Sequence, residues 1–102
     1  MSKAHYLEEA EAEFLAEISY YKSLQVHGAD KFRAAVEEAT ARALTFPKAG
    51  LQYLGNTRRV FLKGYPFFVV YLQAPSGIVV IAVVHEARRP GYWTSRLPGE
   101  LT

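Results

Sequence analysis

The chain has 102 residues, of which 50% are hydrophobic and 14% aromatic, so it is long and apolar enough to fold as one domain with its own core. It contains no cysteine, which excludes a disulfide framework, a cysteine-based zinc site and a cysteine nucleophile. The formal net charge at neutral pH is only +2, and this value alone does not indicate a nucleic-acid-binding protein.

The charge is divided unevenly along the sequence. Residues 1–47 carry eight acidic and five basic side chains, a net charge of −3, whereas residues 48–102 carry seven basic and two acidic ones, a net charge of +5. This asymmetry predicts a basic working surface on the C-terminal half.

The N-terminal segment lacks the apolar stretch of a secretory signal, and no apolar run reaches the roughly 18 residues of a membrane span. We therefore expect a soluble, cytoplasmic protein. The three histidines, His5, His27 and His85, show no metal-ligand spacing, so the sequence predicts no metal site, and nothing in it indicates a cofactor.

The first half of the chain has helical periodicity. Apolar residues recur at steps of three and four from Leu7 to about Leu24, which predicts an amphipathic helix with its glutamates in the first turns. Gly28 interrupts this pattern, and a second apolar stripe then continues to Ala43, before Phe46-Pro47. Two amphipathic helices with a short link predict an antiparallel hairpin over about residues 7–45. The two stripes are Leu7, Ala10, Phe14, Ile18 and Tyr21, then Ala29, Phe32, Val36, Ala39 and Ala43.

The second half predicts strands. After a loop at residues 48–57, three apolar runs at 58–63, 67–72 and 78–84 are separated by short turns, which favours antiparallel pairing. Residues 3–6 are a candidate for one more strand. The sequence thus predicts one α+β domain over residues 1–102, with the hairpin packed on one face of a three- to four-stranded antiparallel sheet at about 58–85. A tail at 86–102 follows, and we expect the other sheet face to remain available.

Polar and aromatic residues gather where the last apolar run ends. Pro90-Gly91 cannot continue a strand, so we expect this cluster on a loop or tail at the edge of the sheet. Arginines beside tyrosine and tryptophan are suited to phosphates and bases, and equally to a protein interface. Alternatively, Trp93 folds back to cover the edge of the sheet. The candidate target-binding residues are Arg59, His85, Arg88, Arg89, Tyr92, Trp93 and Arg96.

Strand alternation predicts Arg59, Phe61 and Lys63 on one face, where they converge with Arg88 if that face adjoins the end of the last strand. His85 follows an apolar strand, where a hydrogen-bonded structural role competes with proton transfer. The sequence contains no nucleotide-binding glycine loop, no Ser-His-Asp set and no carboxylate pair in the C-terminal half, so acid-dependent hydrolysis is not expected.

Five pieces of the chain, in order, resemble the ParE branch of the RelE/ParE superfamily, the type II toxins also described as plasmid stabilisation proteins. The resemblance covers about residues 4–96 and implies a helical hairpin on an antiparallel sheet. The matching pieces are residues 10–14 (AEAEF) with 20–21 (YY), 46–50 (FPKAG), 58–62 (RRVFL), 65–71 (YPFFVVY) and 85–93 (HEARRPGYW).

The resemblance implies two functional classes. ParE-like members poison DNA gyrase by binding, without catalysis, whereas RelE-like members cleave mRNA on the ribosome. A nuclease would need proton-transfer groups and cations around the phosphate, for which the candidates here are Arg59, Lys63, His85, Arg88 and Tyr92. Ribosomal nucleases usually carry a net charge well above +2, so we favour the hypothesis that the protein inhibits gyrase. A third hypothesis is that the protein is an inactive module that only binds its antitoxin.

The resemblance also implies a ParD-like antitoxin that wraps across the toxin and inactivates it. Leu15 and Tyr20 lie about 100° and 120° to either side of the first helix's core stripe, and with Leu24 they are candidate antitoxin-binding residues. Exposed apolar residues there suit an incoming amphipathic helix. In the alternative reading, these residues widen the buried stripe.

Overall fold

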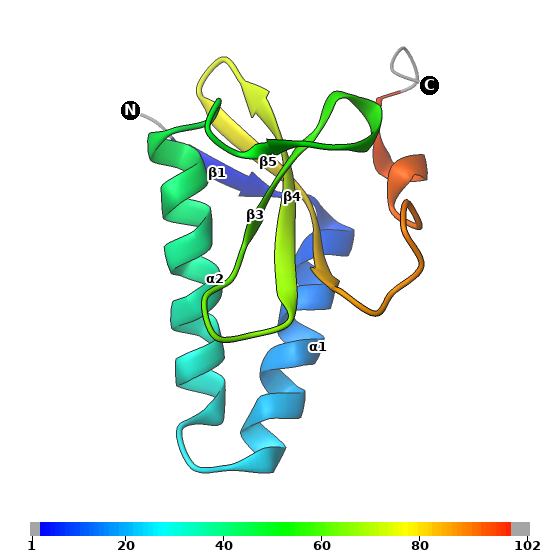
Figure 1. The fold of residues 1–102 in the computed structure, drawn as a ribbon. Helices are drawn as coiled ribbons and strands as arrows, with labels where there is room; N and C mark the ends of the chain where they lie inside the picture. Colours follow the sequence, from blue (N-terminus) through cyan, green and yellow to red (C-terminus); the bar gives the residue numbers. More distant parts are fainter. Residues whose placement is uncertain (1–2, 99–102) are drawn as a thin grey trace.

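Two antiparallel helices lie on one face of a five-stranded sheet in the computed structural model, which describes residues 3–98 (Figure 1). Two short 3₁₀ turns, Leu54–Asn56 and Thr94–Arg96, complete the structure. The elements are β1 (Lys3–Tyr6), α1 (Glu8–Leu24), α2 (Gly28–Thr45), β2 (Leu51–Gln52), β3 (Arg58–Phe61), β4 (Phe67–Ala74) and β5 (Gly77–His85). Within residues 3–98, no helix has the length and apolar character needed to cross a bilayer.

The helical hairpin is confirmed with its core stripes. Helix α1 buries Ala10, Phe14 and Ile18, and α2 buries its own apolar face from Phe32 to Ala43. The connection is tight at Gly28, where a Cβ atom would lie 2.1 Å from the carbonyl oxygen of Tyr21. Only glycine allows the two helices to approach so closely at this turn.

The sheet has the strand order β1-β5-β4-β3-β2. The predicted antiparallel pairing of β3, β4 and β5 is confirmed, and so is the strand at residues 3–6, which pairs in parallel with β5. The structure departs from the prediction at the other edge of the sheet. The expected loop contains β2, which adds a short antiparallel edge to β3, and β3 ends at Phe61 because the chain turns away before Lys63.

Strand alternation divides the apolar residues between two cores. On β4, Phe67, Val69 and Tyr71 face the helices, while Phe68 and Val70 face the opposite side. The register between β4 and β5 shifts after Val70, so that two successive β5 residues, Ile81 and Ala82, join the core on the side away from the helices.

This second face of the sheet is covered, contrary to the prediction that it remains available. Residues 86–97, called the C-terminal segment below, run across it, and their Trp93 is completely buried against Tyr53 and Phe68. The sheet is hydrophobic on both faces, and exposing the second one would leave a large apolar area in water. The structure therefore confirms the alternative in which Trp93 folds back onto the sheet. Of the predicted tail, residues 99–102 lie outside the described part of the chain.

Trp93→Ala is expected to lower the free energy of unfolding by about 3–5 kcal/mol, because it empties the centre of the second core. Val26→Ala, at a side chain that is 79% exposed, is the matched control and should change stability by less than about 0.5 kcal/mol. Urea denaturation measures both values. Equal stability of the Trp93 variant and the unaltered protein would contradict the second core.

Candidate functional site

The C-terminal segment is held by one carboxylate, that of Glu13 on α1. Arg96 donates to both Glu13 oxygens, with N to O distances of 3.0 and 2.9 Å, and the Tyr92 hydroxyl donates to the same carboxylate. The Arg96 and Glu13 side chains are only 15% and 17% exposed. A charge-assisted pair in such a sheltered position is stronger than one in water. We call Glu13, Tyr92 and Arg96 the clamp.

The clamp also closes the edge of β5. Strand β1 pairs with β5 only from Gly77 to Val80, and the backbone beyond that point lacks a neighbouring strand on this side. There the Val83 amide donates to Glu13 at 3.1 Å, and the Ile81 carbonyl accepts from Arg96 at 3.0 Å. The ion pair thus satisfies backbone groups that an open sheet edge would leave unpaired.

Two guanidinium groups lie close to the Tyr92 ring. The guanidinium carbons of Arg88 and Arg96 are 4.0 and 5.4 Å from the centre of its ring. Burial, together with the hydrogen bond to the Glu13 carboxylate, raises the pKa of the Tyr92 hydroxyl well above its ordinary value of 10.0. The hydrogen bond to Glu13 also raises the pKa of Arg96. Tyr92 is therefore a neutral hydrogen-bond donor at physiological pH.

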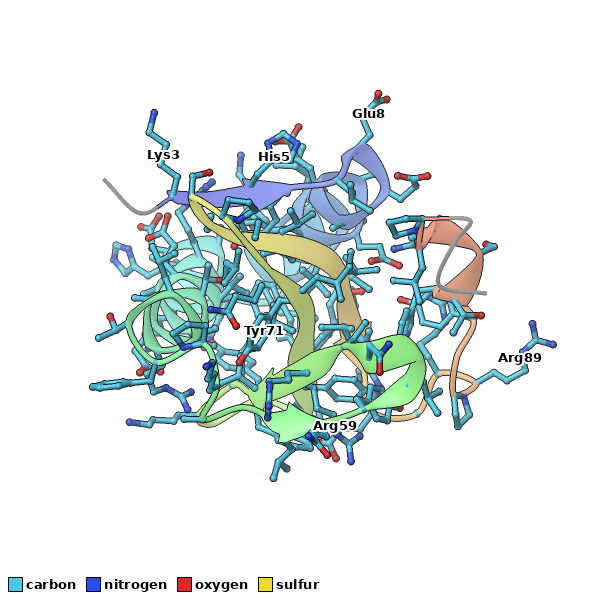
Figure 2. The ribbon with its side chains drawn as sticks, turned by 90° about the horizontal axis from the view of Figure 1, so that it is seen from above. Lys3, His5, Glu8, Arg59, Tyr71 and Arg89 are labelled. Carbon is cyan, nitrogen blue, oxygen red and sulfur yellow. The ribbon has the colours of Figure 1, made fainter. Side chains whose placement is uncertain are left out.

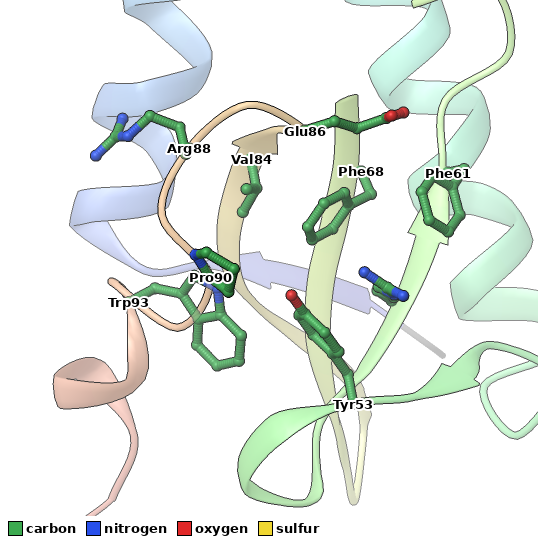
Figure 3. A pocket seen from close by; sticks show the side chains of 9 residues that line it. Tyr53, Phe61, Phe68, Val84, Glu86, Arg88, Pro90 and Trp93 are labelled. Carbon is green, nitrogen blue, oxygen red and sulfur yellow. The ribbon is translucent and has the colours of Figure 1, made fainter. Parts of the chain in front are cut away.

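Beside the clamp, the second face of the sheet contains an open cleft of about 280 Å³. Figure 3 shows its aromatic and apolar walls, with Tyr53 from the segment after β2, Phe61 from β3, and Trp93 from the C-terminal segment. The charged residues that line it are Arg59, Glu86 and Arg88. The cleft exists because the C-terminal segment closes one side of it.

Arg59 lies in this cleft, as alternation along β3 predicts. Its guanidinium carbon is 4.1 Å from the ring centre of Tyr53 and 5.1 Å from those of Phe61 and Phe68. Cation–π contacts of this kind favour a guanidinium at a partly desolvated site. Arg88 lines the same cleft, but its guanidinium lies over the Tyr92 ring, so the two arginines share the cleft and their cationic groups point to different places.

The predicted convergence of Lys63 with these arginines is wrong. Lys63 lies beyond the end of β3, where alternation no longer applies, and its ammonium is 3.9 Å from Glu38 on α2.

His85 also lies on the helix side of the sheet, because its ring packs edge-on against Phe67 at 4.9 Å. Its Nδ1 accepts the Ala87 amide hydrogen at 2.9 Å, as expected of a histidine that holds a turn.

The remaining candidates of the C-terminal segment divide between surface and interior. Arg88 and Arg89 are exposed, and Figure 2 shows Arg89 extending away from the body of the molecule. Trp93 belongs to the second core, while Tyr92 and Arg96 belong to the clamp. Among residues 3–98, no group of three or more acidic or histidine side chains is placed to hold a metal ion.

Leu15, Tyr20 and Leu24 on α1 are 52%, 54% and 56% exposed, so they do not widen the buried stripe. Tyr20 and Leu24 are four residues apart and share one ridge of the helix, whereas Leu15 lies about 140° around the helix from Tyr20. Glu13 is seven residues before Tyr20, within about 20° of the same ridge. The ridge that anchors the C-terminal segment therefore continues into the exposed Tyr20 and Leu24.

A helical hairpin on one face of a mostly antiparallel sheet, with the C-terminal segment clamped on the other, is consistent with the RelE/ParE class of small α+β toxins. The family model described as the ParE toxin of the type II toxin–antitoxin system, parDE, matches residues 5–90. The chain therefore belongs to the ParE toxin family, as its sequence pieces indicated, and membership implies a ParD antitoxin as partner. A comparison with curated proteins gave no match.

Glu13→Ala is expected to lower the free energy of unfolding by about 2–3 kcal/mol, because it leaves Arg96 and the Val83 amide without their acceptor in a sheltered site. Glu38→Ala is the matched control. It removes an ion pair to Arg42 whose side chains are 37% and 42% exposed, and it should cost much less than Glu13→Ala, because exposed ion pairs contribute little. Urea denaturation gives both values, and equal costs would contradict the clamp.

The raised pKa of Tyr92 predicts a loss of stability in alkali. Above about pH 10 the unfolded chain releases the Tyr92 proton while the folded chain keeps it, so the free energy of unfolding falls as pH rises, by up to about 1.4 kcal/mol per pH unit. Tyr92→Phe should show a shallower fall over this range. Tyr6, Tyr21 and Tyr71, whose pKa values burial also raises, contribute equally to both proteins. An identical pH dependence of the free energy of unfolding in both proteins would contradict the raised pKa of Tyr92.

Proposed function

We propose that this ParE-family toxin inhibits growth by binding DNA gyrase through the cleft and the exposed arginines of the C-terminal segment. In this proposal it acts in the cytoplasm without cleaving RNA, and a ParD-like antitoxin inactivates it by docking on α1. The observation that carries the proposal is the separation of the residues that a nuclease would need.

RNA cleavage requires a base, an acid and cations around a single phosphate. Of the five nuclease candidates, only Arg59 and Arg88 line the cleft. Lys63 and His85 lie on the helix side of the sheet, and the Tyr92 hydroxyl donates to Glu13. This separation supports inhibition by binding over the RelE-like alternative.

The C-terminal segment has the properties of a protein-binding surface. Arg88 lines the cleft beside its aromatic walls, and both Arg88 and Arg89 are exposed. Arginine and aromatic residues dominate the energetics of protein interfaces. The clamp fixes the segment before the partner arrives, which lowers the entropic cost of binding.

The surface proposed for the antitoxin is the outward side of α1, with Tyr20 and Leu24 on one flank and Leu15 on the other. Figure 1 shows α1 extending beyond the sheet, away from β1. Three large apolar side chains that are more than half exposed suit the apolar face of an incoming helix. Because the Tyr20 ridge leads to Glu13, an antitoxin there would lie next to the C-terminal segment.

Expression of the chain alone is expected to stop growth and disturb DNA supercoiling, and the purified protein should inhibit gyrase supercoiling while leaving mRNA on ribosomes intact. The double variant Arg88→Glu, Arg89→Glu should weaken gyrase inhibition by about tenfold or more, since it reverses charge at the proposed interface. Lys31→Glu, a charge reversal at another exposed position, on α2, should inhibit like the unaltered protein.

Two results would contradict this proposal. Cleavage of mRNA on ribosomes with supercoiling untouched would indicate a nuclease of the RelE type. Normal growth during expression without an antitoxin would indicate an inactive antitoxin-binding module.

For the antitoxin, Tyr20→Glu is expected to weaken binding by about tenfold or more and to leave the fold intact, because it places a charge in an apolar contact at an exposed site. Leu15→Glu should also weaken binding if the antitoxin spans both flanks of α1. Isothermal titration calorimetry with the antitoxin measures both affinities. An unchanged affinity of the Tyr20 variant would reject this docking surface.

A further inference from the structure

Arg59 differs from the other sheltered arginines of the described chain. Arg42, Arg58 and Arg96 each donate to a protein oxygen, at distances from 2.6 to 3.0 Å. Arg59 makes no such bond within residues 3–98, and its Nε is buried without a protein acceptor. A buried donor that is left unpaired is costly, so the structure maintains a guanidinium that its own fold does not satisfy.

The aromatic rings around Arg59 determine how it can bind. Stacking on Tyr53 at 4.1 Å occupies a face of the guanidinium, which leaves the N–H groups at its edge for a ligand. Parallel N–H groups in one plane match the two oxygens of a carboxylate. The rings also exclude water from one side, which strengthens a charged hydrogen bond formed there.

The size and charge of the cleft favour a single acidic side chain over a larger ligand or a nucleic-acid backbone. Its volume of about 280 Å³ is smaller than most small-molecule sites, which occupy about 300–1,000 Å³, and it accommodates a single side chain. The lining residues Arg59, Arg88 and Glu86 carry a net charge of only +1. Arg88 also stacks on Tyr92, and Figure 3 shows its side chain directed away from the middle of the cleft. A nucleic-acid backbone would need several cations along its path.

We propose that the cleft is a receptor for one carboxylate side chain, aspartate or glutamate, of the target protein, bound by the edge of the Arg59 guanidinium between aromatic walls. The identity of the partner that supplies the carboxylate, namely the target protein, rests on the function proposed above. The preference of the cleft for a carboxylate does not depend on that function. The cleft would recognise a single acidic residue by its shape and charge. The exposed Arg88 and Arg89 would contact the surface of the target around that residue.

The test follows the Arg59 Nε–H signal by NMR in the full chain. The probes are the capped amino acids N-acetyl-glutamate amide and N-acetyl-glutamine amide, which differ in charge but hardly in size, and inorganic phosphate. We expect the glutamate probe to shift this signal in a saturable way and to bind at least about tenfold more tightly than the glutamine probe.

Arg59→Lys keeps the positive charge but removes the planar edge, and it should weaken glutamate binding by about tenfold or more. Because this variant lacks the Arg59 Nε–H group, its affinity is measured from the backbone amide shifts of the residues that line the cleft. Lys31→Gln, at an exposed position of α2 outside the cleft, is the control and should bind like the unaltered chain. The dispersion of the backbone amide spectrum shows that each variant is folded.

Three outcomes would overturn the inference: an Arg59 signal that does not respond to the glutamate probe, equal binding of the glutamate and glutamine probes, or phosphate binding more than about tenfold tighter than glutamate. The last would indicate a nucleic-acid phosphate as ligand. Glutamate binding at Arg59 in a chain that fails to inhibit gyrase would refute the proposed function and leave the carboxylate site in place.

Discussion

The arrangement of the second face of the sheet depends on the Glu13 carboxylate. Its side chain is mostly buried, and it accepts hydrogen bonds from Arg96, from Tyr92 and from the Val83 amide. A carboxylate so sheltered is tolerated only when its oxygens are paired with donors. Three separate parts of the chain, α1, β5 and the C-terminal segment, are thereby fixed relative to one another.

The proposed functional surfaces follow from this constraint. With the C-terminal segment held in place, Trp93 covers the second core and forms a wall of the cleft that contains Arg59. The same ridge of α1 that carries Glu13 continues to Tyr20 and Leu24, which are exposed. The helix proposed to receive the antitoxin is thus the same helix that anchors the C-terminal segment, which carries part of the surface proposed for the target.

Local patterns in the sequence predict the helices, the three central strands and the position of Arg59, because each depends on a period of the chain itself. They leave two alternatives for Trp93, because the covering of the second face depends on contacts across the whole fold. Sequence patterns do not single out Glu13, since it stands among other glutamates of the first turns and its partner Arg96 is 83 residues away. The prediction for Lys63 is wrong because β3 ends two residues earlier.

The central claim is that Glu13 closes the edge of β5 and so holds the C-terminal segment in place. Hydrogen exchange at the Val83 amide tests it most directly, because this amide lies on the β5 edge beyond β1 and donates to Glu13. The account predicts that Val83 exchanges as slowly as the amides that pair β5 with β4, and that Glu13→Ala makes it exchange rapidly. Rapid exchange at Val83 in the unaltered protein would contradict it.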